Sequence, residues 1–263
     1  MILFIVSIII IILIIIIFTG IFLTNGRGNN NDTPVDIVYT WVEMDSSLQI
    51  DLEKYTNPSE TRPLSAYRDT NELLYSLRSI CLFAPWFNHV YLVVRDGQKP
   101  HWLNTNCKKI TLVSHSDIIP SQYLPTFNSI VIEAFLHRIP NLSEQYLYFN
   151  DDIMLWNSAR KNMFFTNDEK CIESSSTIVE NILPLHPTEN YIENETTYEF
   201  MKMMEYNATL LKKYLNVSSP TVSLHTPFPN LKSVNYELDE FLTSIPYKHT
   251  NQHDHTKIGR AHV

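Results

Sequence analysis

The alternation of strand-like and helix-like segments over residues 36–149 constrains the fold of this chain more than any other feature. Four runs rich in β-branched and aromatic residues are typical of strands, at residues 36–42, 89–94, 109–113 and 145–149. Residues 71–84 and 128–139 carry apolar side chains at helical spacing. Strands and helices that alternate at intervals of ~30 residues indicate a doubly wound sheet. We therefore expect an α/β fold with a mostly parallel sheet that binds ligands at the carboxyl ends of its strands.

Residues 2–23 form an uncharged, strongly apolar run at the start of the chain. At ~1.5 Å per helical residue this run spans roughly 33 Å, enough to cross a hydrocarbon core of ~30 Å. It lacks the basic start and the small-residue cleavage site of a signal peptide. We expect a transmembrane anchor over residues 1–24, followed by a polar linker over residues 25–35.

Asn-x-Ser/Thr motifs indicate on which side of the membrane the body lies. They begin at Asn141, Asn194, Asn207 and Asn216, and such motifs are acceptors for N-glycosylation. Charge is a poor guide here, because Arg27 is the only basic residue near the apolar run. We expect a single-pass glycoprotein with its body in the Golgi lumen.

Composition argues against nucleic-acid binding and indicates a folded domain. The 20 Lys and Arg residues against 28 Asp and Glu residues give a net charge of −8, which argues against nucleic-acid binding. A hydrophobic content of 44% is too high for a disordered chain. We expect one domain over residues 36–257, with a polar, irregular stretch at 43–64 and a peripheral insertion at 157–219.

Asn150, Asp151 and Asp152 directly follow the strand at residues 145–149. Carboxylate oxygens in such a position suit Mg²⁺ or Mn²⁺ held against a diphosphate. Two adjacent acids after a strand are equally typical of an ordinary turn. The local pattern leaves both interpretations open.

Two further segments contain side chains that suit phosphate chemistry. Asp69 or Thr70 is placed to cap the helix that follows, with Glu72 in its first turn. Capping does not explain Arg68, whose guanidinium suits phosphate recognition. His225 lies just before two prolines in the run Leu-His-Thr-Pro-Phe-Pro and is a candidate proton carrier, although most of the 10 His residues are expected to be inert.

Five segments, taken in order, resemble the conserved blocks of the Stealth family: residues 36–42, 68–79, 124–129, 137–140 and 148–152. The resemblance extends from Asp36 to about His253 and covers most of the chain. Members of this family include N-acetylglucosamine-1-phosphotransferase and bacterial capsular polysaccharide phosphotransferases. The resemblance implies a nucleotide-sugar transferase-like fold and transfer of a sugar 1-phosphate from a nucleotide diphosphosugar, such as UDP-GlcNAc, to a hydroxyl of an acceptor glycan.

The resemblance also implies roles for individual residues. Asp151 and Asp152 match the metal-binding acids, for Mg²⁺ or Mn²⁺, and His225 matches the active-site histidine, as a base or a phosphate contact. The residues expected to bind the nucleotide sugar are Asp36, Tyr39, Thr40, Trp41, Arg68, Asp69, Asn71, Glu72 and Asn150. Expected partners are the donor, an acceptor glycan or glycoprotein, the membrane, and a second copy of the chain or an accessory subunit.

The carboxyl-terminal part departs from the family pattern. The family has a block resembling Thr-x-x-His-x-x-Arg, which here keeps Thr250 and His253 but has Thr256 in place of the arginine. Residues 258–263 resemble the translation of a sequencing adapter. We expect residues 258–263 to be an artefact, the catalytic domain to be incomplete at its carboxyl end, and this chain alone to be inactive.

Two other functions fit the same residues. A metal-dependent glycosyltransferase would transfer the sugar alone and release the nucleoside diphosphate. A tethered binding protein would hold glycans or nucleotide sugars without catalysis, as the missing arginine favours.

Overall fold

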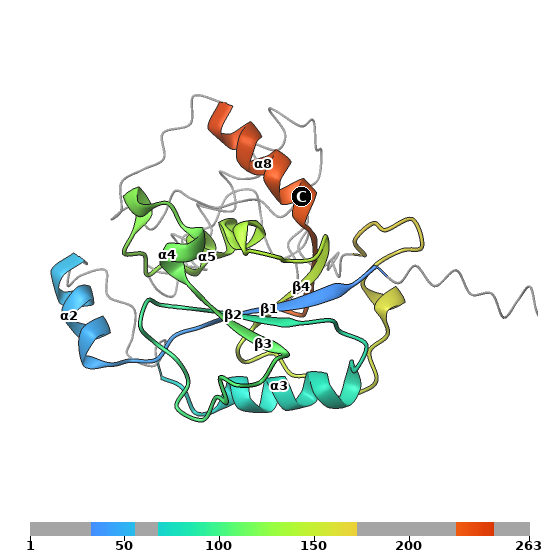
Figure 1. Cartoon of the computed structure of the whole chain (residues 1–263), viewed down its shortest axis with the longest axis horizontal. Helices are drawn as coiled ribbons and strands as arrows, with labels where there is room; N and C mark the ends of the chain where they lie inside the picture. Colours follow the sequence, from blue (N-terminus) through green and yellow to red (C-terminus); the bar gives the residue numbers. More distant parts are fainter. Residues whose placement is uncertain (1–32, 56–67, 173–224, 245–263) are drawn as a thin grey trace, which may run out of the picture. The chain divides into compact units, whose positions relative to one another are not determined.

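A computed structural model describes residues 33–55, 68–172 and 225–244 (Figure 1). The chain divides into two compact units, Met1–Thr33 and Pro34–Val263, and nearly all described residues belong to the second.

A five-stranded mixed sheet forms the centre of this unit. The strands are β1 (Val35–Trp41), β2 (Val90–Val94), β3 (Ile110–Ser114), β4 (Gln145–Asn150) and β5 (Phe228–Leu231). Their order is β3-β2-β1-β4-β5, with β1 to β4 parallel and β5 antiparallel to β4. The predicted α/β class and mostly parallel sheet are confirmed, and the four predicted strands agree with β1 to β4 to within one residue at each end.

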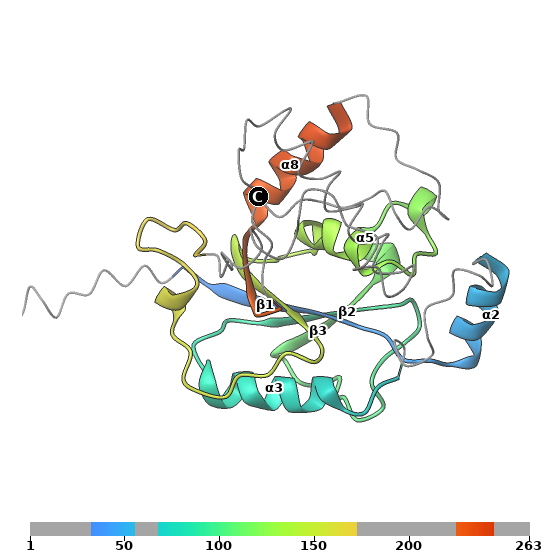
Figure 2. The same ribbon diagram turned by 180° about the vertical axis from the view of Figure 1, so that it is seen from behind.

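Helices cover both faces of the sheet, as Figures 1 and 2 show. The α-helices are α2 (Ser46–Tyr55), α3 (Glu72–Phe83), α4 (His115–Ile118), α5 (Ser129–Ala134) and α8 (Lys232–Ser244). Short 3₁₀ turns are η3 (Ser121–Tyr123), η4 (Leu136–Arg138) and η5 (Lys161–Met163). Helix α3 lies on one face, whereas α4, α5 and α8 lie on the other.

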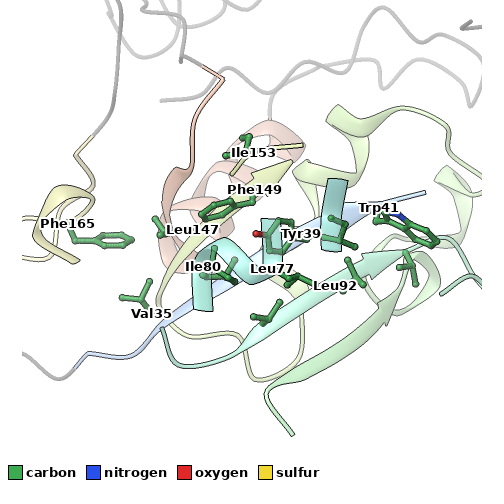
Figure 3. Close-up of a cluster of buried hydrophobic side chains, with 14 residues drawn as sticks. Val35, Tyr39, Trp41, Leu77, Ile80, Leu92, Leu147, Phe149, Ile153 and Phe165 are labelled. Atoms are coloured by element: carbon green, nitrogen blue, oxygen red, sulfur yellow. The ribbon is translucent and has the colours of Figure 1, made fainter. Parts of the chain in front are cut away.

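The core consists of two apolar layers because successive side chains of a strand point to opposite faces. Ile37, Tyr39 and Trp41 of β1 pack with α3 on one face, and Figure 3 shows Tyr39 close to Leu77 and Ile80 of α3. Val38 packs with α4, α5 and η4 on the other face. Both faces of β1 are therefore buried, as expected for a central parallel strand.

Several elements differ from the sequence-based expectations. Helix α2 forms within the stretch predicted to be irregular. The helix predicted over 128–139 ends at Ala134 and continues as η4, and Ile139 is extended because proline at 140 disfavours the α conformation in the residue before it. Strand β5 contains Pro229, which is tolerated because β5 is the edge strand among the described strands.

Helix α8 packs beside η4 on the sheet face that α5 covers. Arg138 donates to Asp239 across a distance of 2.7 Å, and the Asn235 amide donates to the Tyr146 hydroxyl at 3.0 Å. These polar contacts hold α8 against η4 and against β4.

Within the part of the chain that the structure describes, no helix is long and apolar enough to cross a membrane. The anchor predicted for residues 1–24 and the linker up to residue 32 lie outside the described residues, as do residues 173–224 and 245–263. Of the insertion predicted at 157–219, residues 157–172 are described, and Phe165 among them is buried in the core layer beneath α3.

Candidate active site at the β1–β4 edge

The candidate site lies at the carboxyl ends of β1 and β4, which are neighbours in the sheet. Thr40 pairs with Asn150 in the parallel register, so both strands end at the same edge. Strands β2 and β3 lie on one side of β1 and β4 lies on the other. This reversal of strand order is the switch point at which doubly wound sheets bind ligands.

His225 reaches this edge because β5 runs antiparallel to β4. Phe228 pairs with Tyr148, so the residues before Phe228 return to the carboxyl end of β4. The His225 Nε2 atom lies 3.0 Å from Asp152 Oδ1, and its Nδ1 atom lies 3.2 Å from the amide nitrogen of Asn150. Both Asp152 and His225 are largely exposed, with 57% and 62% of their side-chain surface accessible.

Asp151 lies in a concentration of negative charge. Burial, first of all, and the nearby carboxylates of Asp152, Asp69 and Glu72 together raise the pKa of its carboxyl to about 6. Four acids that the sequence predicted for the site are therefore close enough to interact. Such an arrangement favours the binding of a cation, which would relieve their mutual repulsion.

Asp69 connects this cluster to the end of β1 and to the start of α3. Its carboxylate accepts from the Trp41 indole at 3.1 Å and from the backbone N–H of Asn71 at 2.7 Å. The cap residue of α3 is Asn71, at φ 71°, and its side chain makes no cap bond. The predicted capping by Asp69 or Thr70 is therefore wrong, because the Asp69 carboxylate is used in the turn, and asparagine tolerates the left-handed conformation that this turn requires.

Glu72 is the first residue of α3, and its carboxylate also bonds to the turn that precedes the helix. It accepts from the backbone N–H of Thr70 at 2.6 Å and from the Thr70 hydroxyl. These bonds, first of all that of the Thr70 hydroxyl, lower the pKa of Glu72, so the helix starts with a negative charge in its first turn. Arg68 lies just before this turn and is exposed.

Three predicted residues of β1, Asp36, Tyr39 and Trp41, have their side chains in the protein interior. The Tyr39 hydroxyl lies 2.6 Å from the Ser76 hydroxyl of α3, and burial raises the pKa of Tyr39. Asp36 lies at the amino end of β1, with no exposed surface. It accepts from the Asn88 amide at 2.8 Å and from the backbone N–H of Ser143 at 2.7 Å. The structure does not bring Asp36 to the site, because five residues of strand span ~16 Å.

Sequence reasoning missed Tyr148 and Glu133, which lie directly behind the site. The Tyr148 hydroxyl donates to Asn150 Oδ1 at 2.7 Å and lies 2.9 Å from the Thr40 hydroxyl. Burial raises the pKa of Glu133 to about 7, and a hydrogen bond with Tyr148 partly opposes this shift. The available signal was an acidic residue within the otherwise mainly apolar sequence of α5, SIVIEA.

The described residues alone do not complete a metal site. No group of three or more His, Cys, Asp or Glu side chains within 33–55, 68–172 and 225–244 is placed to hold a metal ion. Asp151 and Asp152 nevertheless fit Mg²⁺, which is commonly bound by one or two carboxylates together with substrate phosphates and water.

Comparison with known proteins identifies relatives over most of the chain. Residues 66–172 match the model of Stealth protein conserved region 2. Capsular polysaccharide phosphotransferase cps1A of Actinobacillus pleuropneumoniae is 37% identical over 240 residues, which cover 84% of this chain and 62% of the relative. Capsular polysaccharide phosphotransferase fcs1 of Haemophilus influenzae is 36% identical over 214 residues, 78% of this chain and 56% of the relative.

A third relative extends the comparison to a much longer protein. Exopolysaccharide phosphotransferase SCO2592 of Streptomyces coelicolor is 37% identical over 219 residues, 79% of this chain and 22% of the relative. The chain thus spans less than two thirds of the length of each of these three proteins. The resemblance to the Stealth family is confirmed: the chain carries conserved region 2 of that family and is homologous to bacterial capsular polysaccharide phosphotransferases.

Proposed function

We propose that the protein is a phosphotransferase of glycan synthesis that transfers a sugar 1-phosphate from a nucleotide diphosphosugar to a hydroxyl of an acceptor glycan. The donor that we propose is UDP-GlcNAc. The observation that carries the proposal is the contact of His225 with Asp152 at the switch point of the sheet. The names of the relatives, which are capsular or exopolysaccharide phosphotransferases, support the type of reaction.

The reaction exchanges one phosphorus–oxygen bond for another. The acceptor oxygen forms a bond to the β-phosphorus of the donor, the bond from that phosphorus to the bridging oxygen breaks, and UMP leaves with the electron pair. The hydroxyl proton passes to a base, for which His225 is the candidate. Catalysis of this kind depends mainly on positioning and on neutralising charge.

The chain's own residues divide these tasks among them. Asp151 and Asp152 would hold Mg²⁺ or Mn²⁺, which when bound would neutralise the negative charge of the diphosphate. Arg68 is exposed beside the acid cluster and would contact a phosphate or the nucleotide. Thr40, Trp41 and Asn71 lie at the same edge and would contact the rest of the donor.

A donor with two labels tests this proposal against sugar transfer. UDP-GlcNAc carrying ³²P in the β-phosphate and ³H in the sugar is incubated with the protein, Mn²⁺ and methyl glycosides as acceptors. We expect both labels to enter the product in equal amounts, with release of UMP. Entry of ³H alone, with release of UDP, would establish a glycosyltransferase, and bound donor without any product would establish a binding protein.

A pair of histidine variants assigns the activity to this site. We expect His225→Ala to lower turnover by ~10²-fold or more, because a positioned proton-transfer or phosphate-binding group is lost. His89→Ala is the matched control, since His89 contacts Thr111 near the amino ends of β2 and β3. Equal turnover by the His225→Ala variant and the unmodified protein would remove His225 from the site.

A further inference from the structure

Two serines lie on the buried side of α3, among apolar side chains. Ser76 has no exposed surface and Ser79 is also buried, and Leu73, Leu77 and Ile80 are the buried apolar residues of the same helix. A buried hydroxyl is costly unless it is hydrogen-bonded. The partners of these two hydroxyls therefore indicate why serine occupies both positions.

Both serine hydroxyls bond to the backbone of the segment that follows β4. Ser76 donates to the carbonyl of Ile153. Ser79 donates its hydrogen to the Ser76 carbonyl at 2.7 Å, and its oxygen accepts from the backbone N–H of Leu155 at 2.9 Å. Helix α3 is thereby bonded to the chain as it leaves the carboxyl edge of the sheet.

The bonded segment begins in the turn that carries the two acids of the candidate site. Asn150 is the last residue of β4, and Asp151 and Asp152 follow it. A hydrogen bond from the Ile153 N–H to the Asn150 carbonyl, at 3.2 Å, closes the turn, which we call the acid turn. The Ile153 side chain packs in the same buried cluster as Tyr39 (Figure 3). The acid turn is thus held by the strand at its entry and by α3 at its exit.

The Tyr39 hydroxyl belongs to the same set of bonds, and its direction follows from the chemistry of the groups. A carbonyl oxygen can only accept, so the single hydroxyl hydrogen of Ser76 is used at Ile153. The Tyr39 hydroxyl, 2.6 Å from the Ser76 oxygen, must therefore donate to it. The one hydroxyl hydrogen of Tyr39 is consequently used inside the protein, where this side chain has no exposed surface.

Helix α3 also begins at the other acids of the site. The Asp69 carboxylate accepts from the N–H of the cap residue Asn71, and Glu72 is the first residue of the helix. Both carboxylates lie close enough to Asp151 to interact with it electrostatically. Bonds between α3 and the acid turn therefore also fix the two pairs of acids relative to each other.

We propose that Tyr39, Ser76 and Ser79 are positioning residues that hold the acid turn from the interior side, so that its carboxylates stay where the cation and the donor diphosphate would bind. The effect on the donor rests on the proposed function, whereas the bonding of the turn does not. Tyr39, for which the family resemblance implied a contact with the donor, then acts on the donor only through the turn. A misplacement of about 1 Å in such a site can cost ~10²-fold in rate.

Amide hydrogen exchange of the full chain tests the bonding without metal or substrate. Ser79→Ala removes the acceptor of the Leu155 N–H, so exchange of that amide should rise by at least ~5-fold more than exchange of the Leu92 amide, which lies in the buried strand β2 and reports on unfolding of the sheet. Tyr39→Phe should raise exchange at Ile153 by at least ~3-fold in the same comparison. Equal rises at Leu92 would show a loss of global stability alone and would overturn the local role.

The matched control removes a tyrosine hydroxyl from a neighbouring strand. The Tyr91 hydroxyl donates to the Asn141 carbonyl at 3.0 Å, near the amino end of β4. We expect Tyr91→Phe to leave the same two amides unchanged relative to the sheet. An effect as large as that of Tyr39→Phe would overturn the specific connection between Tyr39 and the acid turn.

Calorimetric titration with UDP-GlcNAc in the presence of Mn²⁺ separates positioning from direct contact. If Tyr39 touched the donor, Tyr39→Phe would weaken binding, whereas Ser79→Ala and Ser76→Ala would not, because these hydroxyls bond to buried backbone. Positioning predicts that all three variants weaken donor binding by ~3–10-fold, with no change in Tyr91→Phe. Unchanged affinity in both serine variants would overturn the positioning role. Absence of donor binding by the unmodified protein would contradict the proposed function, and the exchange comparison would still decide the bonding of the turn.

Discussion

Aspartates near the two ends of β1 differ in burial and in hydrogen bonding. At the amino end, Asp36 is buried and both of its carboxylate oxygens accept hydrogen bonds from neighbouring elements. At the carboxyl edge, Asp152 is exposed, and burial together with neighbouring like charges raises the pKa of Asp151. The comparison indicates that a buried acid with both oxygens bonded holds the fold together, whereas a cluster of crowded acids at a switch point is suited to a ligand.

The largest effect that tests this comparison is on stability. Asp36→Ala leaves the Asn88 amide and the Ser143 N–H unpaired, so we expect the free energy of unfolding to fall by ~2–4 kcal/mol. Asp152→Ala at an exposed position should change it by less than ~0.5 kcal/mol. Urea unfolding followed by circular dichroism measures both values. Equal destabilisation by the two substitutions would contradict the view that Asp36 stabilises the fold and Asp152 does not.

A smaller effect is the contribution of Glu133, behind the site, to the pH dependence of stability. The folded protein holds the proton of Glu133 up to a pH of about 7, above the ordinary value of 4.5. The folded state thus binds more protons than the unfolded chain in this range, and the contribution of Glu133 to stability decreases as pH rises from about 4.5 to 7. Glu133→Gln has no proton to lose, so its free energy of unfolding should decrease less with pH over this interval. If the free energy of unfolding changed with pH in the same way in Glu133→Gln and in the unmodified protein, the raised pKa of Glu133 would be contradicted.

Much of the fold was predictable because the signal lies in local patterns. Strand β2 is buried throughout and β1 is buried except for Thr40, so both runs are mainly apolar without strict alternation, as expected on a parallel sheet. Strand β5 and helix α8 were not predicted, because β5 has only four residues with a proline among them. Helix α8 does carry apolar residues at helical spacing, Val234, Leu238 and Phe241, and this signal was overlooked. Contacts with β4 and η4 determine where β5 and α8 lie.

The candidate site was predictable only in part, for a geometric reason. Asp151 and Asp152 follow a strand directly, so the local pattern was sufficient to propose a site there. His225 is 73 residues away from Asp152 in the sequence, and only the family resemblance related the two. The family resemblance grouped Asp36 and Tyr39 with Thr40. Tyr39 points to the face opposite Thr40 because side chains alternate along a strand, and Asp36 lies at the other end of β1.

Calorimetric titration with UDP-GlcNAc tests most directly the claim that the acids of the carboxyl edge bind a metal with the donor diphosphate. Titrations are made with and without Mn²⁺ for the unmodified protein, for Asp152→Asn and for Asp168→Asn, in which an exposed acid of the loop after η5 is changed. We expect Mn²⁺ to increase donor affinity in the unmodified protein and in Asp168→Asn, and to have no effect in Asp152→Asn. The same Mn²⁺-dependent affinity in all three proteins would contradict the account and make Asp151 and Asp152 an ordinary turn.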